Sequence, residues 1–200
     1  MQPVSVTALL LGLILAASLT GLLVSPGLIE RSLLRPYWLL RKHQYATIIT
    51  SAFMHANLAH LAFNLITFWS FGFQLERAMG SGRFAALYLS GLLVSAWGTW
   101  LKHRADPAYA TLGASGAILA VLFASIVYFP TQSLYLMLLP VPIPAPLFAL
   151  AYLGYTWYAA HKLQGRVNHD AHFGGAIAGL LFVALTDPDA WRRTIALLLG

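Results

Sequence analysis

The strings Gly113-Ala114-Ser115-Gly116 and Ala171-His172-Phe173-Gly174-Gly175 each open an apolar segment of this chain. Both set a reactive polar side chain among residues that are small enough for close backbone approach. A hydroxyl and an imidazole are the two parts of an activated serine nucleophile. Ionisable groups within membrane segments are costly and usually functional, so the two strings predict chemistry below a membrane surface.

The composition indicates a polytopic membrane protein. Of the 200 residues, 59% are hydrophobic and 9% are charged, whereas soluble domains carry roughly a quarter of charged residues. The chain has no cysteine, which excludes disulfides, thiolate metal sites and a cysteine nucleophile. The net charge of +6 suits a bilayer with anionic headgroups. Because the twelve Lys and Arg are scattered along the chain, nucleic acid is not an expected partner.

Six segments have the apolar character of membrane-spanning helices, which need about 20 residues each. No repeat or linker divides them, so we expect a single domain over residues 1–200. Residues 25–52 should form an interfacial first loop. Residues 130–146, with five prolines and no charge, should form a rigid non-helical connection. The expected spans are residues 6–24, 53–75, 84–101, 112–129, 147–161 and 171–185.

The order of the spans brings the unusual polar residues to one level. Consecutive spans alternate in direction, so the second, fourth and sixth spans begin at the same membrane face. His60 and Asn64 lie early in the second span, Ser115 in the first turn of the fourth, and His172 in the first turn of the sixth. The sequence therefore predicts one polar cluster near one membrane face.

Ser115 has a structural alternative, which its surroundings weaken. A serine in a membrane helix commonly bonds only to its own backbone or to a neighbouring helix. Here the residue begins a helix whose first amides lack intrahelical partners, and those donors suit an oxyanion. Gly116 and Ala120 contribute to a small-residue face that another helix could approach closely. Ser115 is therefore the candidate nucleophile.

His172 is the candidate general base. Gly175 and Gly179 follow it one helical turn apart, a spacing that permits a close helix crossing. If the partner is the small-residue face after Ser115, the imidazole reaches the hydroxyl and can accept its proton. The alternatives are a histidine satisfied by a loop carbonyl, and His169 as a competing base. No carboxylate is spaced to orient the imidazole, so a Ser–His dyad is expected.

His60 and Asn64 are four residues apart and share one face of a helix. Both can donate hydrogen bonds to a developing negative charge, although a structural role in linking helices stays open. His55 lies about 140° from His60 around a helix. No glutamate follows either histidine as a zinc-protease motif requires. We therefore expect no metal and no cofactor.

In combination these motifs resemble the rhomboid intramembrane serine proteases, over roughly residues 45–186. The resemblance implies an all-α bundle of six transmembrane helices, in the minimal bacterial form without an extramembrane N-terminal domain or a seventh helix. It implies that Ser115 is the nucleophile and His172 its base, and that His60 and Asn64 join the Ser115 amide in stabilising the oxyanion. The motifs are His55-x4-His60-x3-Asn64, Glu76-Arg77-x2-Gly80-Ser81, Gly113-Ala114-Ser115-Gly116 and Ala171-His172-x-Gly174-Gly175-x3-Gly179.

Two positions depart from the family pattern. The first loop of the family often carries a Trp-Arg pair shortly before the second helix, where this chain reads Arg41-Lys42-His43-Gln44-Tyr45. Some relatives place an aromatic residue one turn after the serine, against the imidazole, where this chain has Leu119. Neither departure removes a reacting group. Glu76 and Arg77 are expected to pair with a loop and to serve the fold.

The expected function is an intramembrane serine endopeptidase that cleaves single-span or polytopic membrane proteins near the membrane surface. The alternative is a catalytically silent rhomboid-like protein for binding or quality control. A small transporter would need polar residues through both membrane halves, yet the later halves of the second, fourth and sixth spans are almost wholly apolar. The resemblance implies a multi-pass protein of the bacterial inner (plasma) membrane. It also orients the active site outward, whereas the Lys and Arg count of the loops favours the reverse.

Overall fold

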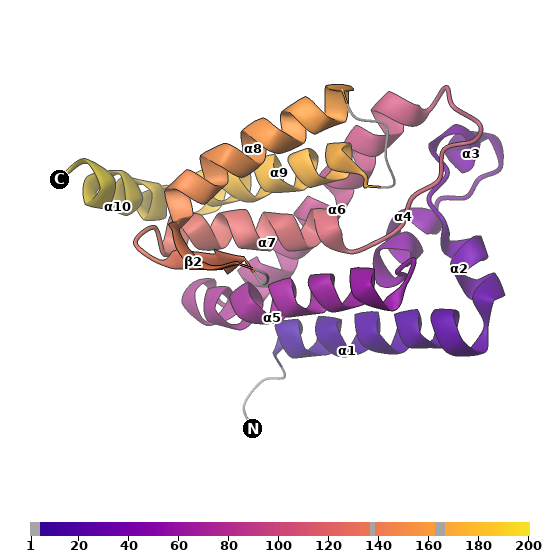
Figure 1. Ribbon diagram of the computed structural model, residues 1–200, viewed down its shortest axis with the longest axis horizontal. Helices are drawn as coiled ribbons and strands as arrows, with labels where there is room; N and C mark the ends of the chain where they lie inside the picture. The colour runs from indigo at the N-terminus through magenta and orange to yellow at the C-terminus, as the bar shows by residue number, and fades with distance from the viewer. Residues whose placement is uncertain (1–4, 137–138, 163–166) are drawn as a thin grey trace.

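The structure is mostly helical, with the long helices packed side by side and short ones at the ends (Figure 1). It is a computed structural model that describes residues 5–136, 139–162 and 167–200. In chain order the elements are α1 (Val6–Leu19), the π-helix η1 (Thr20–Val24), α2 (Pro26–Ser32), α3 (Pro36–Arg41), α4 (Thr47–Thr50), the 3-10 helix η2 (Ser51–Phe53), α5 (Leu58–Met79), α6 (Ser81–His103), α7 (Ser115–Tyr128), β1 (Ser133–Leu136), β2 (Leu139–Pro144), α8 (Ala145–Lys162), α9 (His169–Thr186) and α10 (Pro188–Leu199).

Each of the six expected spans contains a long helix, but two helices begin later than predicted. α5 begins at Leu58 because Asn57 caps it, its side chain accepting a hydrogen bond from the His60 amide at 2.8 Å. α7 begins at Ser115, since Gly113 has φ of +124° and cannot continue a right-handed helix. In both cases a local backbone signal ends the apolar run before the helix starts.

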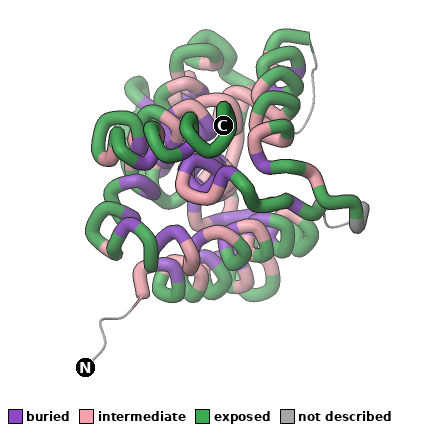
Figure 2. Tube along the Cα trace, turned by 90° about the vertical axis from the view of Figure 1, so that its left-hand side faces the viewer, coloured by how far each residue is buried: buried purple, intermediate pink, exposed green. Residues whose placement is uncertain are grey.

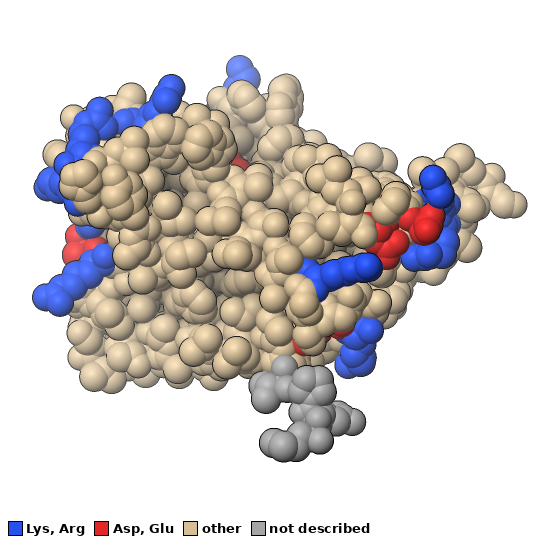
Figure 3. Space-filling model, turned by 180° about the vertical axis from the view of Figure 1, so that it is seen from behind, with Lys and Arg blue, Asp and Glu red and all other residues tan. Residues whose placement is uncertain are grey.

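Length and apolar composition qualify only some of the helices in the described residues as membrane spans. Val6–Val24 and Ser81–His103 qualify by themselves, and α9 with α10 would add a third if this pair, bent by 106°, is one span. The count of six spans therefore stays a prediction. The surface agrees with a membrane location, because most of the charged side chains in Figure 3 gather toward two ends of the face and few lie between them.

The expectation of an all-α protein needs a correction in the connection between α7 and α8. Part of this segment forms an antiparallel hairpin, in which β1 pairs with β2 through Ser133 with Pro144 and Tyr135 with Pro142. The prolines of β2 stand at alternate positions 140, 142 and 144. Backbone N–H groups of alternate residues point to the same edge of a strand. Proline has no N–H, so these three prolines are tolerated where that edge faces away from β1.

Helix α7 lies at the centre of the bundle. Every residue from Gly116 to Val127 is buried, as the purple interior of the tube in Figure 2 illustrates. A helix that is apolar on all sides needs neighbours on all sides, and here α5, α6, α8 and α9 supply them. The residue that begins this helix is consequently held by the whole bundle.

Glu76, near the carboxyl end of α5, makes hydrogen bonds to the start of α1 and to Ser81. These bonds stand in place of the ion pair expected from the sequence. Its carboxylate accepts from the Ser5 hydroxyl at 2.6 Å and from the amides of Val6 and Thr7 at 2.8 and 2.9 Å. The Ser81 hydroxyl donates to it at 2.7 Å. A carboxylate at the amino end of α1 satisfies orphan amides and complements the helix dipole, so Glu76 fastens α1 to the end of α5.

Helix α10 turns away from α9 by 106° and lies across the end of the bundle (Figure 2). Asp187 makes this corner, because its side chain accepts from the Ala190 amide at 3.1 Å and from the Tyr128 hydroxyl at 2.7 Å. The hydrogen bond from Tyr128 is the largest of the effects that lower the pKa of Asp187. The corner therefore ties α10 to the carboxyl end of α7.

Candidate functional site

Ser115 is the first residue of α7 and stands at an uncapped helix end. The N-cap residue, Ala114, makes no side-chain capping bond, so the first-turn amides are free to serve another acceptor. The turn before it requires Gly113, where a Cβ would lie 2.8 Å from Cε1 of His60. Glycine thus lets the chain turn and also leaves room for the imidazole of His60.

His172 lies in the first turn of α9, which its N-cap residue anchors. The side-chain oxygen of Asn168 accepts from the Ala171 amide at 2.9 Å. Its amide nitrogen donates to the hydroxyls of Thr99 and Thr111, at 3.0 and 3.3 Å. One asparagine therefore caps α9 and joins its start to α6 and to the loop before α7.

The side chains of His172 and Ser115 are in contact, with 2.8 Å between Nε2 and Oγ. The contact depends on the predicted close crossing of α7 and α9, which the structure confirms. A Cβ at Gly175 would overlap the carbonyl oxygen of Gly116, and one at Gly179 would overlap that of Ala120. The two backbones thus touch directly beneath the serine and the histidine.

A cavity of about 640 Å³ brings the four predicted site residues together. Ser115, His172, His60 and Asn64 all line it. The Asn64 amide nitrogen donates to the carbonyl of His60 at 3.0 Å, which leaves a second amide hydrogen for another acceptor. The same cavity is bordered by apolar side chains, including Phe63, Ile118 and Leu119, so polar donors and an apolar surface share one space.

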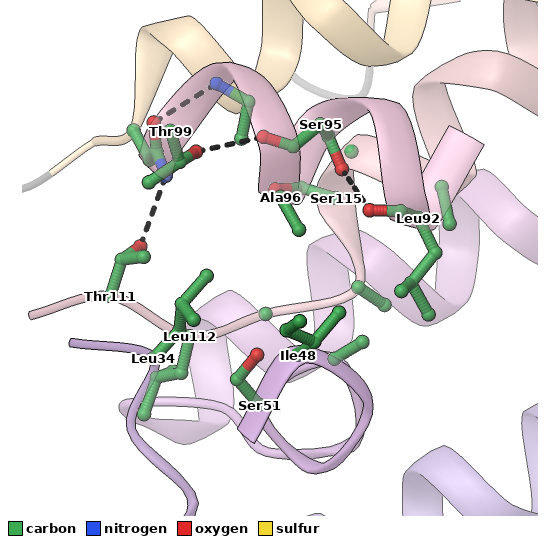
Figure 4. Close-up of a pocket in the computed structure, with 17 residues that line it drawn as sticks. Leu34, Ile48, Ser51, Leu92, Ser95, Ala96, Thr99, Thr111, Leu112 and Ser115 are labelled. Carbon is green, nitrogen blue, oxygen red and sulfur yellow. Dashed lines mark hydrogen bonds between the residues drawn. The ribbon is translucent and has the colours of Figure 1, made fainter. Parts of the chain in front are cut away.

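A smaller pocket of about 40 Å³ adjoins Ser115 and is lined by residues of α4, α6 and the loop before α7. Figure 4 shows the hydroxyls of Ser51, Ser95, Thr99 and Thr111 around it. Its size and polarity suit a water molecule. Ser115 consequently borders both a large open cavity and a small pocket that carries several hydroxyls.

Comparison with known proteins matches residues 42–188 to the rhomboid domain. The chain belongs to the rhomboid family. It is similar to Rhomboid protein 1, mitochondrial, of Saccharomyces cerevisiae, with 34% identity over 74% of this chain and 45% of the relative. It is also similar to Presenilin-associated rhomboid-like protein A, mitochondrial, of Danio rerio, with 32% identity over 73% of this chain and 39% of the relative.

A third similar protein is RHOMBOID-like protein 12, mitochondrial, of Arabidopsis thaliana, with 30% identity over 74% of this chain and 46% of the relative. The chain spans less than half of the length of these three relatives. Their names place all three in mitochondria. These relatives therefore do not support the expected location in a bacterial inner membrane. This rhomboid is a membrane protein.

The sequence reasoning missed one residue of this rhomboid site, Tyr152 of α8. Its hydroxyl lies 3.2 Å from Nδ1 of His172. Tyr152, Tyr155 and Tyr158 follow one another at intervals of three along an aromatic-rich segment, and spacing alone does not show which of them faces the interior. Only the packing of α8 against α9 selects Tyr152.

Three other polar residues near the rhomboid motifs make no side-chain hydrogen bond to Ser115 or His172 within the described residues. His55 is fully buried and bonds to the Ser18 hydroxyl through Nδ1 at 2.9 Å. His169, the competing base, packs edge-on against Tyr155 and against His172, with 5.6 and 6.1 Å between ring centroids, and does not bond to Ser115. Asp170 faces away from His172, as the spacing indicated, and bonds to side chains of α6.

Asp170 ties the start of α9 to the end of α6. Its carboxylate contacts Nζ of Lys102 at 2.8 Å and Nε2 of His103 at 3.1 Å. The His103 ring stacks on Tyr109 with 3.6 Å between centroids. Burial, together with the nearby charge of Asp170, raises the pKa of Tyr109 to about 12, so this phenol stays neutral. The cluster supports the helix that carries His172 and takes no direct part in the pair.

Within the described ranges, no three His, Asp or Glu side chains gather closely enough to hold a metal ion. The histidines of the site act on other partners. His172 contacts Ser115 and Tyr152, while His60 packs edge-on against His55 with 4.8 Å between ring centroids. The chemistry available from these residues is acid–base and nucleophilic.

Proposed function

We propose that this rhomboid is an intramembrane serine endopeptidase that cleaves membrane-protein substrates. The family consists generally of intramembrane serine proteases, although some members are inactive. The observation that carries the proposal is the 2.8 Å contact between Oγ of Ser115 and Nε2 of His172 in the wall of an open cavity. A weak hydroxyl nucleophile needs such a base within hydrogen-bond reach.

In the proposed reaction Ser115 and His172 act together in two stages, formation of an acyl ester and its hydrolysis. Oγ of Ser115 attacks the scissile carbonyl carbon while its proton passes to Nε2 of His172. The carbon–nitrogen bond then breaks, and the imidazolium returns the proton to the leaving amine, which leaves an acyl ester on Ser115. Water attacks this ester with His172 again accepting a proton, and the carboxylic acid product departs as the hydroxyl is restored.

His60 and Asn64 are proposed to stabilise the oxyanion that forms at the substrate carbonyl. The first amides of α7, the helix that Ser115 begins, have no side-chain cap, and a helix amino end favours negative charge. The second amide hydrogen of Asn64 supplies another donor, and His60 supplies a third. Several preorganised donors aimed at a developing oxyanion are a strong source of rate acceleration.

The substrate class follows from the location of the site. A substrate backbone that crosses a membrane is hydrogen-bonded as a helix, and its carbonyls are shielded from attack. The proposed substrate therefore unwinds locally near the membrane surface, where small or helix-breaking residues make unwinding easier. The apolar border of the cavity, at Phe63, Ile118 and Leu119, is suited to a side chain of the unwound segment.

Replacement of Ser115 by alanine tests this function. Purified protein in proteoliposomes is incubated with a library of single-span substrates and, separately, with a fluorophosphonate probe that labels activated serines. Ser115→Ala should abolish both cleavage and labelling while the melting temperature is unchanged, since it removes one hydroxyl and opens almost no space. Ser125→Ala is the matched control, because Ser125 is the other serine of α7 and is buried in the bundle, and it should retain both signals.

Two results would contradict the proposal. Full proteolysis by Ser115→Ala would remove Ser115 as the nucleophile. Failure of the wild-type protein both to cleave any substrate and to react with the probe would instead support a catalytically silent rhomboid that binds membrane proteins.

A further inference from the structure

Tyr152 reaches the site from a helix that carries neither Ser115 nor His172. Its ring stacks on Phe148 of the same helix, with 5.4 Å between centroids, and lies 5.8 Å from Phe123 of α7. These two contacts fix the direction of the phenol. Its hydroxyl ends 3.2 Å from Nδ1 of His172, on the side of the imidazole away from Ser115.

The position that Tyr152 occupies is the one from which a third group orients the base of a serine nucleophile. No carboxylate of residues 5–136, 139–162 or 167–200 takes that position. Asp170 is the nearest acid in sequence, and its oxygens are engaged by Lys102 and His103. Among the residues that the structure describes, the Tyr152 hydroxyl is the partner that it assigns to Nδ1.

The proton on His172 determines whether the pair can react. A neutral imidazole carries one hydrogen, on either Nδ1 or Nε2. Nε2 can accept the Ser115 proton only in the form that carries its hydrogen on Nδ1. That hydrogen needs an acceptor, and the phenol oxygen is in place to accept it.

We propose that Tyr152 is a positioning residue for His172. The phenol oxygen of Tyr152 accepts a hydrogen bond from Nδ1–H of His172 and thereby keeps Nε2 free for the Ser115 proton. The inference rests on the proposed protease function. When the proton moves from Oγ to Nε2, the imidazole becomes a cation, and the Nδ1–H bond to the phenol oxygen becomes charge-assisted and stronger. The interaction thus favours the transition state over the resting enzyme.

The bond also makes the alignment of the pair depend on three helices. Ser115 belongs to α7, His172 to α9 and Tyr152 to α8. The opposite side of α8 is exposed, with Leu150 and Trp157 showing 72% and 56% of their surface. A displacement of α8 would therefore remove the partner of Nδ1 without moving either reacting group.

Tyr152→Phe tests the kinetic part of this inference, because it removes the hydroxyl and keeps the ring contacts. Hydrogen bonds to charged groups contribute about 1.5–3 kcal/mol, so kcat should fall by about 10-fold to 100-fold. KM and the melting temperature should change little, since the ring that lines the cavity is kept and the lost hydroxyl contacts the base. Tyr158→Phe is the matched control, because Tyr158 lies on the same helix with its side chain exposed, and its kinetics should equal those of the wild type.

Nuclear magnetic resonance of histidine labelled with nitrogen-15 tests the hydrogen bond without requiring proteolysis. The His172 signals are identified by their loss in His172→Ala. In the wild type the hydrogen should reside on Nδ1 with the downfield shift of a hydrogen-bonded proton, and in Tyr152→Phe that shift should be lost. A hydrogen on Nε2 in the wild type, or an unchanged signal in Tyr152→Phe, would overturn the inference.

The two arms separate this inference from the protease function. If the wild type cleaves substrate while Tyr152→Phe changes neither kcat nor the resonance, the role of Tyr152 is wrong and the protease function stands. If the resonance changes as expected while the wild type shows neither cleavage nor labelling, the hydrogen bond is real and the protease function is wrong.

Discussion

Asn64 and His172 border the same cavity but have different roles in the proposed reaction. His172 must exchange a proton with Ser115, and its Nε2 lies 2.8 Å from Oγ. Asn64 would only donate a hydrogen bond, and its amide is oriented by the bond to the carbonyl of His60. Loss of the base should therefore prevent activation of Ser115, whereas loss of one oxyanion donor should only slow the reaction.

At this scale we predict that Asn64→Ala slows cleavage while probe labelling of Ser115 continues slowly. Removal of one oxyanion donor typically costs about 2.7–4 kcal/mol, or roughly 10²–10³ in rate. His172→Ala should lose both turnover and labelling, because the hydroxyl is no longer activated. Rates of fluorophosphonate labelling and of cleavage in detergent measure both effects, with melting curves to show that each variant is folded.

Thr67→Ala is the control for Asn64, because Thr67 lines the same cavity and its hydroxyl donates only to the carbonyl of Phe63 in its own helix. It should be close to the wild type. If Asn64→Ala silenced Ser115 completely while His172→Ala still labelled at the wild-type rate, the base would have to lie on α5. His60 would then be the first candidate.

The crossing of α7 and α9 is the element-scale feature on which the site depends. Small residues are favoured where membrane helices meet because lipid gives helices no hydrophobic reason to associate. Here the close approach at Gly175 and Gly179 replaces side-chain packing by backbone contact. The same approach sets the starts of both helices level, with Ser115 on one and His172 on the other.

We predict that Gly175→Ala lowers both stability and activity. The added Cβ would overlap the carbonyl oxygen of Gly116, a backbone atom that cannot rotate away, so the helices must separate. Overpacking of this kind costs about 1–3 kcal/mol or more. Thermal melting in detergent should show a lower transition temperature, and cleavage should fall because the contact between His172 and Ser115 lengthens.

Gly154→Ala supplies a control of opposite sign. A Cβ at Gly154 of α8 meets nothing within 4 Å, and alanine is preferred over glycine in a helix by up to about 1 kcal/mol. Its melting temperature should equal or exceed that of the wild type. A Gly175→Ala protein that melts and cleaves like the wild type would show that this crossing is not required.

For the whole molecule, the open question is which end of the bundle faces which side of the membrane. By the span assignment from the sequence, the connections on the side of the site hold eight cations and those on the opposite side hold four, so the count favours a cytoplasmic site. The structure gives several of the eight a partner within the fold. Arg35 pairs with Glu30 and Lys102 with Asp170, while Arg41, Lys42 and Arg104 lie over the rings of Tyr37, Trp38 and Trp100.

We predict that single cysteines at the two ends react from opposite sides of the membrane, with the site end outward. The chain has no cysteine of its own, so Ala105→Cys and Gly82→Cys would be labelled without background. Both positions are exposed, Ala105 at the site end after α6 and Gly82 in the first turn of α6. A maleimide that cannot cross the membrane should label Ala105→Cys in intact cells and Gly82→Cys only after permeabilisation.

Labelling of both cysteines from one side would show that α6 does not cross the membrane. Labelling of Gly82→Cys in intact cells and of Ala105→Cys only after permeabilisation would reverse the orientation and support the charge count. The same proteins, assayed for cleavage, show that the labelled protein is folded.

The sequence by itself was sufficient for the helical architecture and for the neighbourhood of the site. Apolar segments of span length, the glycines after His172 and the small residues after Ser115 are local patterns, and local patterns determine helices and the faces they can present. They predicted the α7–α9 crossing correctly. They did not predict the hairpin between α7 and α8, because a run of alternating prolines excludes helix without showing which strand it pairs with.

Only the tertiary structure decided which side chains from distant helices meet. Periodicity states the face on which a residue lies, but the partner depends on the rotation and tilt of another helix. For this reason the sequence did not single out Tyr152 among three tyrosines of α8, nor the capping of α1 by Glu76, nor the bonds from Asn168 to Thr99 and Thr111. Each is a contact between segments more than about a span apart in the chain, and its geometry is set by packing across the whole bundle.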